Sequence, residues 1–324
     1  MSKRKDETPA GGDLFGAAAP AQPSVARTGK SAIGKSAIGK AAAKPAGDDP
    51  LAGATGVAAI DGIRCGIGGW TYAPWRDNFY PPKLVQRREL EYASRRLSSI
   101  EINGTFYSAQ KPATYAKWAA ETPDGFVFSL KAPGRVTQAG ALAKATAQAK
   151  AFIDGGLAEF GDRLGPILWQ LAPSRRFDPD DLAPFLDALP RTLDGRALKH
   201  VLEVRHSSFL GPQYLQLARE RRIATVFTDS DEYPSLADLT GDFVYARLMR
   251  SRADIATGYP DGELDAWAQR ARTWARGGDN PDLPHVGAVQ ADGATREVYL
   301  YFISAAKHRN PAAAMALTER LRGG

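Results

Sequence analysis

From about residue 60 onward, short apolar runs alternate with longer stretches whose apolar residues recur at helical spacing. The short runs have the length of strands and are rich in β-branched and aromatic side chains. They predict strands at residues 63–67, 99–102, 126–130, 167–171, 200–204, 224–228, 243–248 and 298–303.

The longer stretches predict helices, because their apolar positions return every three or four residues. These helices cover residues 86–97, 113–121, 141–160, 180–189, 213–222, 261–276 and 311–321. Asn310 precedes Pro311 and is the expected N-cap of the last helix. Only the link at 230–242 is too short, and too interrupted by Pro234, to hold a full helix.

Eight predicted strands, seven of them followed by a helix, indicate the α/β class. We predict a (β/α)₈ TIM-type barrel that forms a single domain over residues 59–324. A doubly wound open sheet is the alternative, although no glycine-rich phosphate loop follows the first strand.

Residues 1–58 differ from the rest, since they are mainly Ala, Gly, Pro, Ser and Lys. Such a segment buries too little apolar surface to offset the entropy of ordering, so we expect a disordered tail. Residues 31–35 and 36–40 repeat the sequence Ser-Ala-Ile-Gly-Lys. The repeated lysines would not share a helix face, which favours a flexible, solvated basic tether over a folded repeat array. Weak charge-driven contact of this tether with nucleic acid or an anionic surface is the less favoured alternative.

Composition narrows the class of protein. The single cysteine, Cys65, excludes an internal disulfide and fits a reducing compartment. No apolar run reaches the length of a membrane span, and the basic N-terminus lacks a following apolar segment. We therefore expect a cytoplasmic protein that makes no membrane contact. A net charge of +6 in 324 residues permits contact with nucleic acid but does not require it.

Candidate chemistry lies where the predicted strands end, because a TIM barrel gathers its functional groups at that face. Glu101 and Asn103 show this clearly, since they leave one face of a short strand that stops at Gly104. The other strand ends contribute further polar and aromatic residues. These are Trp70, Tyr72 and Trp75, then Tyr107, Lys131, Gln170, Glu203, Arg205, His206, Asp229 and Arg247.

Our leading interpretation is an enzyme, a hydrolase or an isomerase, that acts on an anionic small molecule or nucleotide. Lys131, Arg205 and Arg247 would bind its phosphate or carboxylate group. Glu101 or Glu203 would act as general acid or base, and Asp229 would orient a partner. The remaining substrate-binding candidates are Asn103, Gln170 and His206, with Trp70, Tyr72, Trp75 and Tyr107 as an apolar wall.

Two alternatives remain open. Glu101, Glu203, Asp229 and His206 are suitable ligands for a divalent metal that assists phosphodiester or sugar chemistry. Three nearby cations would compete with such an ion. Alternatively, ion pairs such as Glu203–Arg247 or Glu101–Arg205 satisfy the barrel interior in a non-catalytic protein that binds ligands or associates with nucleic acid. The sequence identifies no cofactor.

Several motifs occur in a fixed order between residue 63 and the last helix. They are Gly-Gly-Trp-Thr-Tyr at 68–72, Glu-Ile-Asn-Gly-Thr-Phe-Tyr at 101–107, Lys-Ala-Pro at 131–133, Gly-Pro-Ile-Leu-Trp-Gln-Leu at 165–171 and Glu-Val-Arg-His at 203–206. Together they resemble the YecE-like family, domain of unknown function 72. The resemblance implies a TIM-type barrel and no particular reaction.

Two segments depart from the pattern of that family. Met249 and Arg250 stand where the family usually has a His-Gly pair. The segment at 304–307, Ser-Ala-Ala-Lys, replaces an Asn-Asn-Asp run. The resemblance therefore assigns no role to the loop after the eighth strand.

Overall fold

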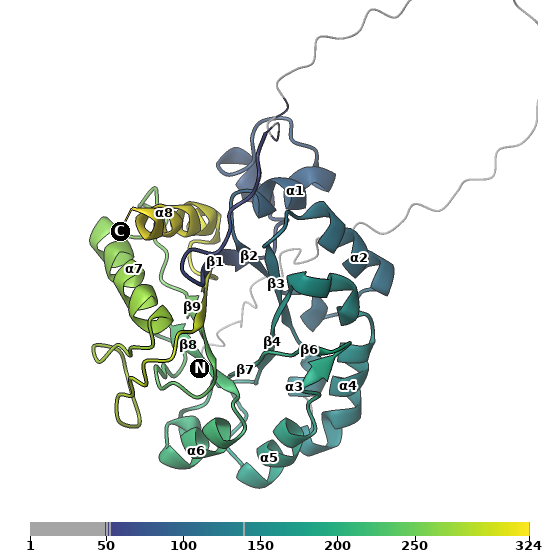
Figure 1. Ribbon diagram of the computed structural model, residues 1–324, viewed down its shortest axis with the longest axis vertical. Helices are drawn as coiled ribbons and strands as arrows, with labels where there is room; N and C mark the ends of the chain where they lie inside the picture. Colours follow the sequence, from purple (N-terminus) through teal and green to yellow (C-terminus); the bar gives the residue numbers. More distant parts are fainter. Residues whose placement is uncertain (1–48, 50, 52, 139, 324) are drawn as a thin grey trace, which may run out of the picture.

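In a computed structural model of the protein, residues 49, 51, 53–138 and 140–323 are described. Within these residues eight parallel strands form a closed barrel, and helices surround it (Figure 1). Each predicted strand is present, with ends shifted by at most a few residues. The strands are β1 (Ile63–Gly68), β2 (Ser99–Ile102), β3 (Val127–Lys131), β4 (Leu164–Gln170), β7 (His200–Glu203), β8 (Ala224–Asp229), β9 (Phe243–Leu248) and β10 (Glu297–Phe302). The predicted (β/α)₈ barrel is confirmed.

The helices lie outside the ring of strands (Figure 1). They are α1 (Glu89–Ser94), α2 (Pro112–Glu121), α3 (Gly134–Thr137), α4 (Thr146–Asp154), α5 (Pro179–Asp187), α6 (Pro212–Glu220), α7 (Asp261–Ala275) and α8 (Asn310–Arg322). The link between β8 and β9 contains no helix, as its length and Pro234 predicted. A small antiparallel hairpin, β5 (Thr192–Leu193) with β6 (Arg196–Ala197), precedes β7.

The single helix predicted at 141–160 is wrong. The segment divides into a 3₁₀ turn at Leu142–Ala145, the helix α4, and a second 3₁₀ segment at Leu157–Arg163. Two glycines follow α4, and Gly156 adopts a φ of 122°. This conformation is open to glycine and cannot continue a right-handed helix.

The expected N-cap role of Asn310 is also wrong. Asn310 is the first residue of α8, and Arg309 occupies the cap position. The side chain of Asn310 accepts a hydrogen bond from Ser251 Oγ at 2.8 Å and donates one to the carbonyl of Ser304 at 3.3 Å. It therefore joins the loop after β9 to the loop after β10.

Apolar side chains form two layers, one on each side of the strands. The larger cluster lies between the strands and the helices and includes Ile100, Ile102 and the buried Cys65. A smaller cluster fills the barrel interior and includes Tyr245, Tyr299 and Tyr301. Because successive residues of a strand face opposite sides, Glu101 faces this interior between Ile100 and Ile102.

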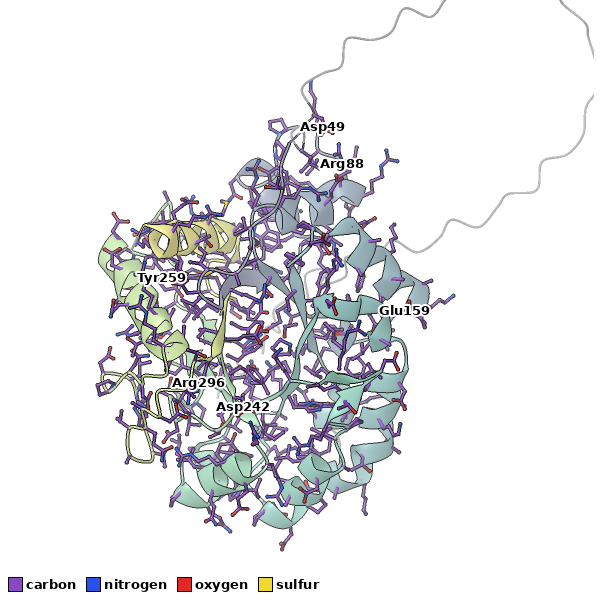
Figure 2. The ribbon with its side chains drawn as sticks, in the orientation of Figure 1. Asp49, Arg88, Glu159, Asp242, Tyr259 and Arg296 are labelled. Carbon is purple, nitrogen blue, oxygen red and sulfur yellow. The ribbon has the colours of Figure 1, made fainter. Side chains whose placement is uncertain are left out.

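The described chain begins against the barrel. Arg88 Nη1 lies 2.9 Å from Asp49 Oδ1, at the edge of the molecule where the described residues start (Figure 2). Leu51 is buried. Both residues belong to the segment predicted as tail, so packing begins before residue 58. The repeat at 31–40 lies outside the described residues. No helix among the described residues combines the length and apolar character that crossing a bilayer requires.

Candidate functional site

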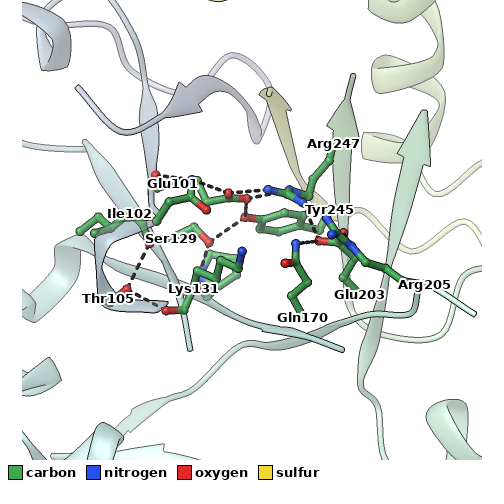
Figure 3. Close-up of polar contacts among 12 residues, drawn as sticks. Glu101, Ile102, Thr105, Ser129, Lys131, Gln170, Glu203, Arg205, Tyr245 and Arg247 are labelled. Carbon is green, nitrogen blue, oxygen red and sulfur yellow. Dashed lines mark hydrogen bonds and ion pairs between the residues drawn. The ribbon is translucent and has the colours of Figure 1, made fainter. Parts of the chain in front are cut away.

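Three charged side chains meet inside the barrel near the ends of β2, β7 and β9. Glu101, Glu203 and Arg247 are each at most 3% exposed. Arg247 lies between the two carboxylates, with Nη2 3.0 Å from Glu101 Oε1 and Nη1 2.7 Å from Glu203 Oε2 (Figure 3). The Glu203–Arg247 pair was among those considered from the sequence, whereas Arg205 pairs with Glu203 rather than with Glu101.

Electrostatic attraction keeps Arg247 and Glu203 charged despite their burial. Burial alone would lower the pKa of Arg247, but Glu101 and Glu203 outweigh it and raise that pKa above its ordinary range. Burial would likewise raise the pKa of Glu203, yet Arg247 and Arg205 hold it below the usual value. The cluster therefore contains a buried guanidinium and an ionised Glu203 at neutral pH.

Further hydrogen bonds occupy both carboxylates. Tyr245 Oη donates to Glu101 Oε2 at 2.6 Å, and Asn103 Nδ2 donates to Oε1 at 2.9 Å. Gln170 Nε2 donates to Glu203 Oε2 at 2.9 Å, and Arg205 Nε donates to Oε1 at 2.7 Å. Every carboxylate oxygen of the cluster thus accepts hydrogen bonds from at least two donors or from a guanidinium. Such carboxylates hold their neighbours in place.

Hydroxyl groups continue this network into the barrel. Tyr301 Oη lies 2.6 Å from Ser99 Oγ, and Tyr245 Oη lies 2.9 Å from Ser129 Oγ. Ser99 and Ser129 also donate to the carbonyls of Val127 and Pro166. Burial raises the pKa of Tyr245 and of Tyr301 far above the ordinary value, so both phenols stay protonated.

A cavity of about 320 Å³ opens above this cluster, at the C-terminal ends of the strands. Four cationic side chains line it, namely Lys131, Arg205, Arg247 and Lys307. No carboxylate of the described residues is among its lining groups. Glu101 and Glu203 lie behind the cations, so the charged groups that a ligand meets are cationic.

Lys131, at the end of β3, is a cation of the cavity lining whose burial is not offset by an ion pair. Its Nζ lies 3.9 Å from the centre of the Phe106 ring, and among the described residues no carboxylate lies within ion-pair distance of it. Burial, reinforced by the charge of Arg247, lowers the pKa of Lys131 to about 8. Figure 3 shows its side chain directed toward the Glu101–Arg247 cluster.

Lys307 is a site residue that the predictions missed. Its Nζ lies 4.5 Å from the centre of the Tyr72 ring, and burial lowers its pKa. Lys307 belongs to the segment at 304–307, and the departure of that segment from the family pattern was the one feature of the sequence that could have indicated it. Ser304 and Ala305, with φ values of 60° and 44°, turn this loop back toward the mouth.

Aromatic side chains form one wall of the cavity. Trp70 and Trp118 pack edge to face with ring centres 4.9 Å apart, and both line the cavity with Tyr107. Trp70 and Tyr107 were predicted here. Trp118 was not, because it belongs to the helix predicted at 113–121 rather than to a strand end.

Seven of the predicted side chains lie together around the cavity: Trp70, Asn103, Tyr107, Lys131, Gln170, Arg205 and Arg247. Glu101 and Glu203 support them from within the barrel. The structure does not bring the remaining four, Tyr72, Trp75, His206 and Asp229, to the lining of the cavity.

Local contacts explain these four positions. Trp75 is 1% exposed, and its Nε1 donates to the carbonyl of Lys307 at 2.9 Å. Tyr72 packs against the Trp75 ring. His206 Nδ1 accepts from the backbone N–H of Ser208 at 3.0 Å, as the cap of a short 3₁₀ turn. Asp229 pairs with Arg250 at 3.1 Å, and burial raises its pKa.

The candidate metal ligands are consequently dispersed. Arg247 separates Glu101 from Glu203, while Asp229 and His206 have the local partners described above. Across residues 49, 51, 53–138 and 140–323, no cluster of three or more His, Cys, Asp or Glu side chains could hold a metal ion. The balance of three acidic and three basic groups expected at the mouth is therefore replaced by an excess of cations.

Comparisons with known proteins agree with the fold. Residues 64–324 match the family described as protein of unknown function DUF72. UPF0759 protein YunF of Bacillus subtilis is 34% identical over 70 residues, which are 22% of this chain and 24% of that protein. The alignment thus spans about a quarter of that relative.

Two solved structures of DUF72 proteins superpose on most of the chain. The one from Thermotoga maritima has a TM-score of 0.63 and 19% identity, covering 80% of this chain and 99% of its own. The one from Enterococcus faecalis has a TM-score of 0.57 and 15% identity, covering 80% and 95%. At these identities the likeness concerns the fold.

Proposed function

The chain belongs to the DUF72 family of proteins of unknown function, and we propose that its barrel mouth binds a small organic anion. The ligand class is a molecule with a carboxylate or phosphate group next to a flat or apolar part. The observation that carries this proposal is the cavity lining, which has four cations and no carboxylate among the described residues. A desolvated group of cations is stabilised when an oxyanion enters.

The arrangement of the cations supports binding of an oxyanion. Arg205 uses Nε for Glu203, and the structure gives its two terminal nitrogens no hydrogen-bond partner within the described residues. Its guanidinium is steadied by the Tyr233 ring, 4.0 Å away. A guanidinium fixed in this way offers two parallel donors to a carboxylate or phosphate. The Trp70–Trp118 wall suits the apolar part of the ligand.

In this proposal Glu101 and Glu203 position the cations. The acid–base role first predicted for them requires a carboxylate able to exchange a proton with the ligand. Their carboxylate oxygens are buried and already accept hydrogen bonds, and the pKa of Glu203 is lowered. Both observations favour the positioning role instead. The predicted class of reaction, hydrolytic or isomerising, remains a proposal that rests on the mouth as a whole.

Titration calorimetry with phenyl phosphate and benzoate at low salt tests the proposal. We expect binding of at least one of the two, and little binding of neutral phenol. Lys307→Gln should weaken the binding about tenfold, because one charged contact to the anion is lost. Lys307 makes no ion pair with a described carboxylate, so its replacement leaves the Glu101–Arg247 cluster intact.

Arg250→Gln is the matched control. It removes the same unit of charge from a half-exposed side chain that pairs with Asp229 and Asp231, outside the cavity lining. Binding should be almost unchanged in this variant. Equal losses in Lys307→Gln and Arg250→Gln, or no binding of either anion to the unaltered protein, would contradict the proposed function.

A further inference from the structure

We propose that Lys131 is a reactive amine that forms an imine with the carbonyl group of an anion bound in the mouth. This inference rests on the proposed function, because it needs the anion to be held beside Lys131. It narrows the ligand class to small aldehydes or ketones that also carry a carboxylate or phosphate group.

The position of Lys131 supports this assignment. The residue ends β3 and lines the cavity between Gln170 of β4 and the residues that follow β2. Thr105 Oγ1 donates to its backbone carbonyl at 2.7 Å, which fixes the base of the side chain. The amine therefore reaches the cavity from the end of a strand, at the C-terminal face of the barrel where ligands bind.

Its surroundings favour the neutral amine that attack on a carbonyl requires. The charged groups that act on it are Glu101 of β2, Glu203 of β7, Arg205 just beyond β7, and Arg247 of β9. Both carboxylates are paired with the two arginines, at hydrogen-bond distances of 2.7–3.2 Å, and therefore stabilise the ammonium form of Lys131 only weakly. The Phe106 ring, 3.9 Å from Nζ, gives the ammonium form a cation–π contact in place of an ion pair, which is too weak to offset its burial. A lysine that is desolvated beside other cations is activated as a nucleophile.

The step balances without a co-reactant. The Nζ lone pair attacks the carbonyl carbon, forming the C–N bond, and the carbonyl oxygen takes up a proton from the amine through solvent. The resulting carbinolamine loses its hydroxyl group and one proton as water. One amine and one carbonyl group thus give one imine and one water, with no change of oxidation state.

The test uses 4-carboxybenzaldehyde as probe and sodium cyanoborohydride, which delivers hydride to an imine and makes the bond permanent. Peptide mass mapping then measures the modification of each lysine. We expect Lys131 to react about tenfold faster than Lys150, a 63% exposed side chain on α4. Neutral benzaldehyde should show little of this preference, and benzoate should protect Lys131.

Benzoate binding by the unaltered protein separates this inference from the function on which it rests. Lys131→Arg replaces the primary amine with a guanidinium, so the fast-reacting site should be lost in that variant. Modification of Lys131 no faster than Lys150, in protein that binds benzoate, would overturn the imine but leave the anion site. Preferential modification of Lys307 would overturn the assignment to Lys131. Failure of the unaltered protein to bind either benzoate or phenyl phosphate would overturn both.

Discussion

Replacing Arg247 by Met should lower the free energy of unfolding by about 3–5 kcal/mol, the usual result of removing one partner from a buried ion pair. Glu101 and Glu203 are both fully buried, and each has Arg247 as a partner within 3.0 Å. Without the guanidinium, two desolvated carboxylates face each other across the barrel interior. Urea unfolding, followed by circular dichroism, measures the change.

The nearby Arg250 supplies the control for this loss. Its side chain is 49% exposed and pairs with Asp229 and Asp231. Because exposed pairs contribute little, Arg250→Met should change stability by less than about 1 kcal/mol. An Arg247→Met variant that unfolds at nearly the same urea concentration as Arg250→Met would show that the buried cluster is not what holds the barrel interior.

A triple variant identifies the cause as uncompensated charge. Adding Glu101→Gln and Glu203→Gln to Arg247→Met removes the two stranded negative charges and keeps groups of similar shape. Neutral replacements of a whole buried ionic cluster are often tolerated, so the triple variant should recover a large part of the lost stability. If the triple variant is no more stable than Arg247→Met, lost packing rather than charge explains the effect.

The barrel could be predicted because each strand is determined by the pattern of residues within its own short segment. Alternation of apolar side chains determines a strand, and the ends of β2 and β9 coincide with those predicted at 99–102 and 243–248. The same alternation placed Glu101 and Arg247 on the interior face, and closure of the parallel sheet brought them together. Periodicity and one rule of topology therefore sufficed for seven side chains of the cavity lining.

Which charged side chains pair with one another in the site cannot be predicted from the periodicity of the sequence. Whether Arg247 contacts Glu101, Glu203 or the ligand is decided by side-chain geometry across the barrel, between residues 146 and 44 positions apart. The same holds for Trp75, which a 3₁₀ turn at Ala73–Asp77 places beneath the loop that carries Lys307. Neither outcome follows from the spacing of residues along one element.

Lys307 shows how a loop residue escapes sequence reasoning. Its position results from two non-glycine residues in the left-handed region, Ser304 and Ala305, and from the bonds of Asn310 to Ser251 and Ser304. The left-handed conformation is unfavourable for serine and alanine, so surrounding contacts must impose it. The cations of the mouth thus come from strand ends, which pattern predicts, and from one loop, which it does not.

Lys131 should react with acetic anhydride at a lower pH than surface lysines do, because a much larger fraction of its amine is neutral. A pKa of about 8 leaves roughly a tenth of the Lys131 amine neutral at pH 7. An amine with the ordinary lysine pKa of about 10.4 is neutral about 200-fold less often at that pH. Competitive labelling over pH 6–11, read by peptide mass mapping, should give Lys131 a midpoint near 8, with the exposed Lys150 as internal reference.

The variant Arg205→Gln tests whether neighbouring charges lower the pKa of Lys131. Arg205 lowers the pKa of Lys131, and it also neutralises Glu203, whose charge raises that pKa. Removing the guanidinium acts in the same direction through both routes, so the midpoint for Lys131 should move upward. A midpoint near 10 in the unaltered protein, or a downward shift in Arg205→Gln, would contradict the electrostatic account. The amine would then be an ordinary ammonium ion at neutral pH, suited to holding an anion and not to attacking a carbonyl carbon.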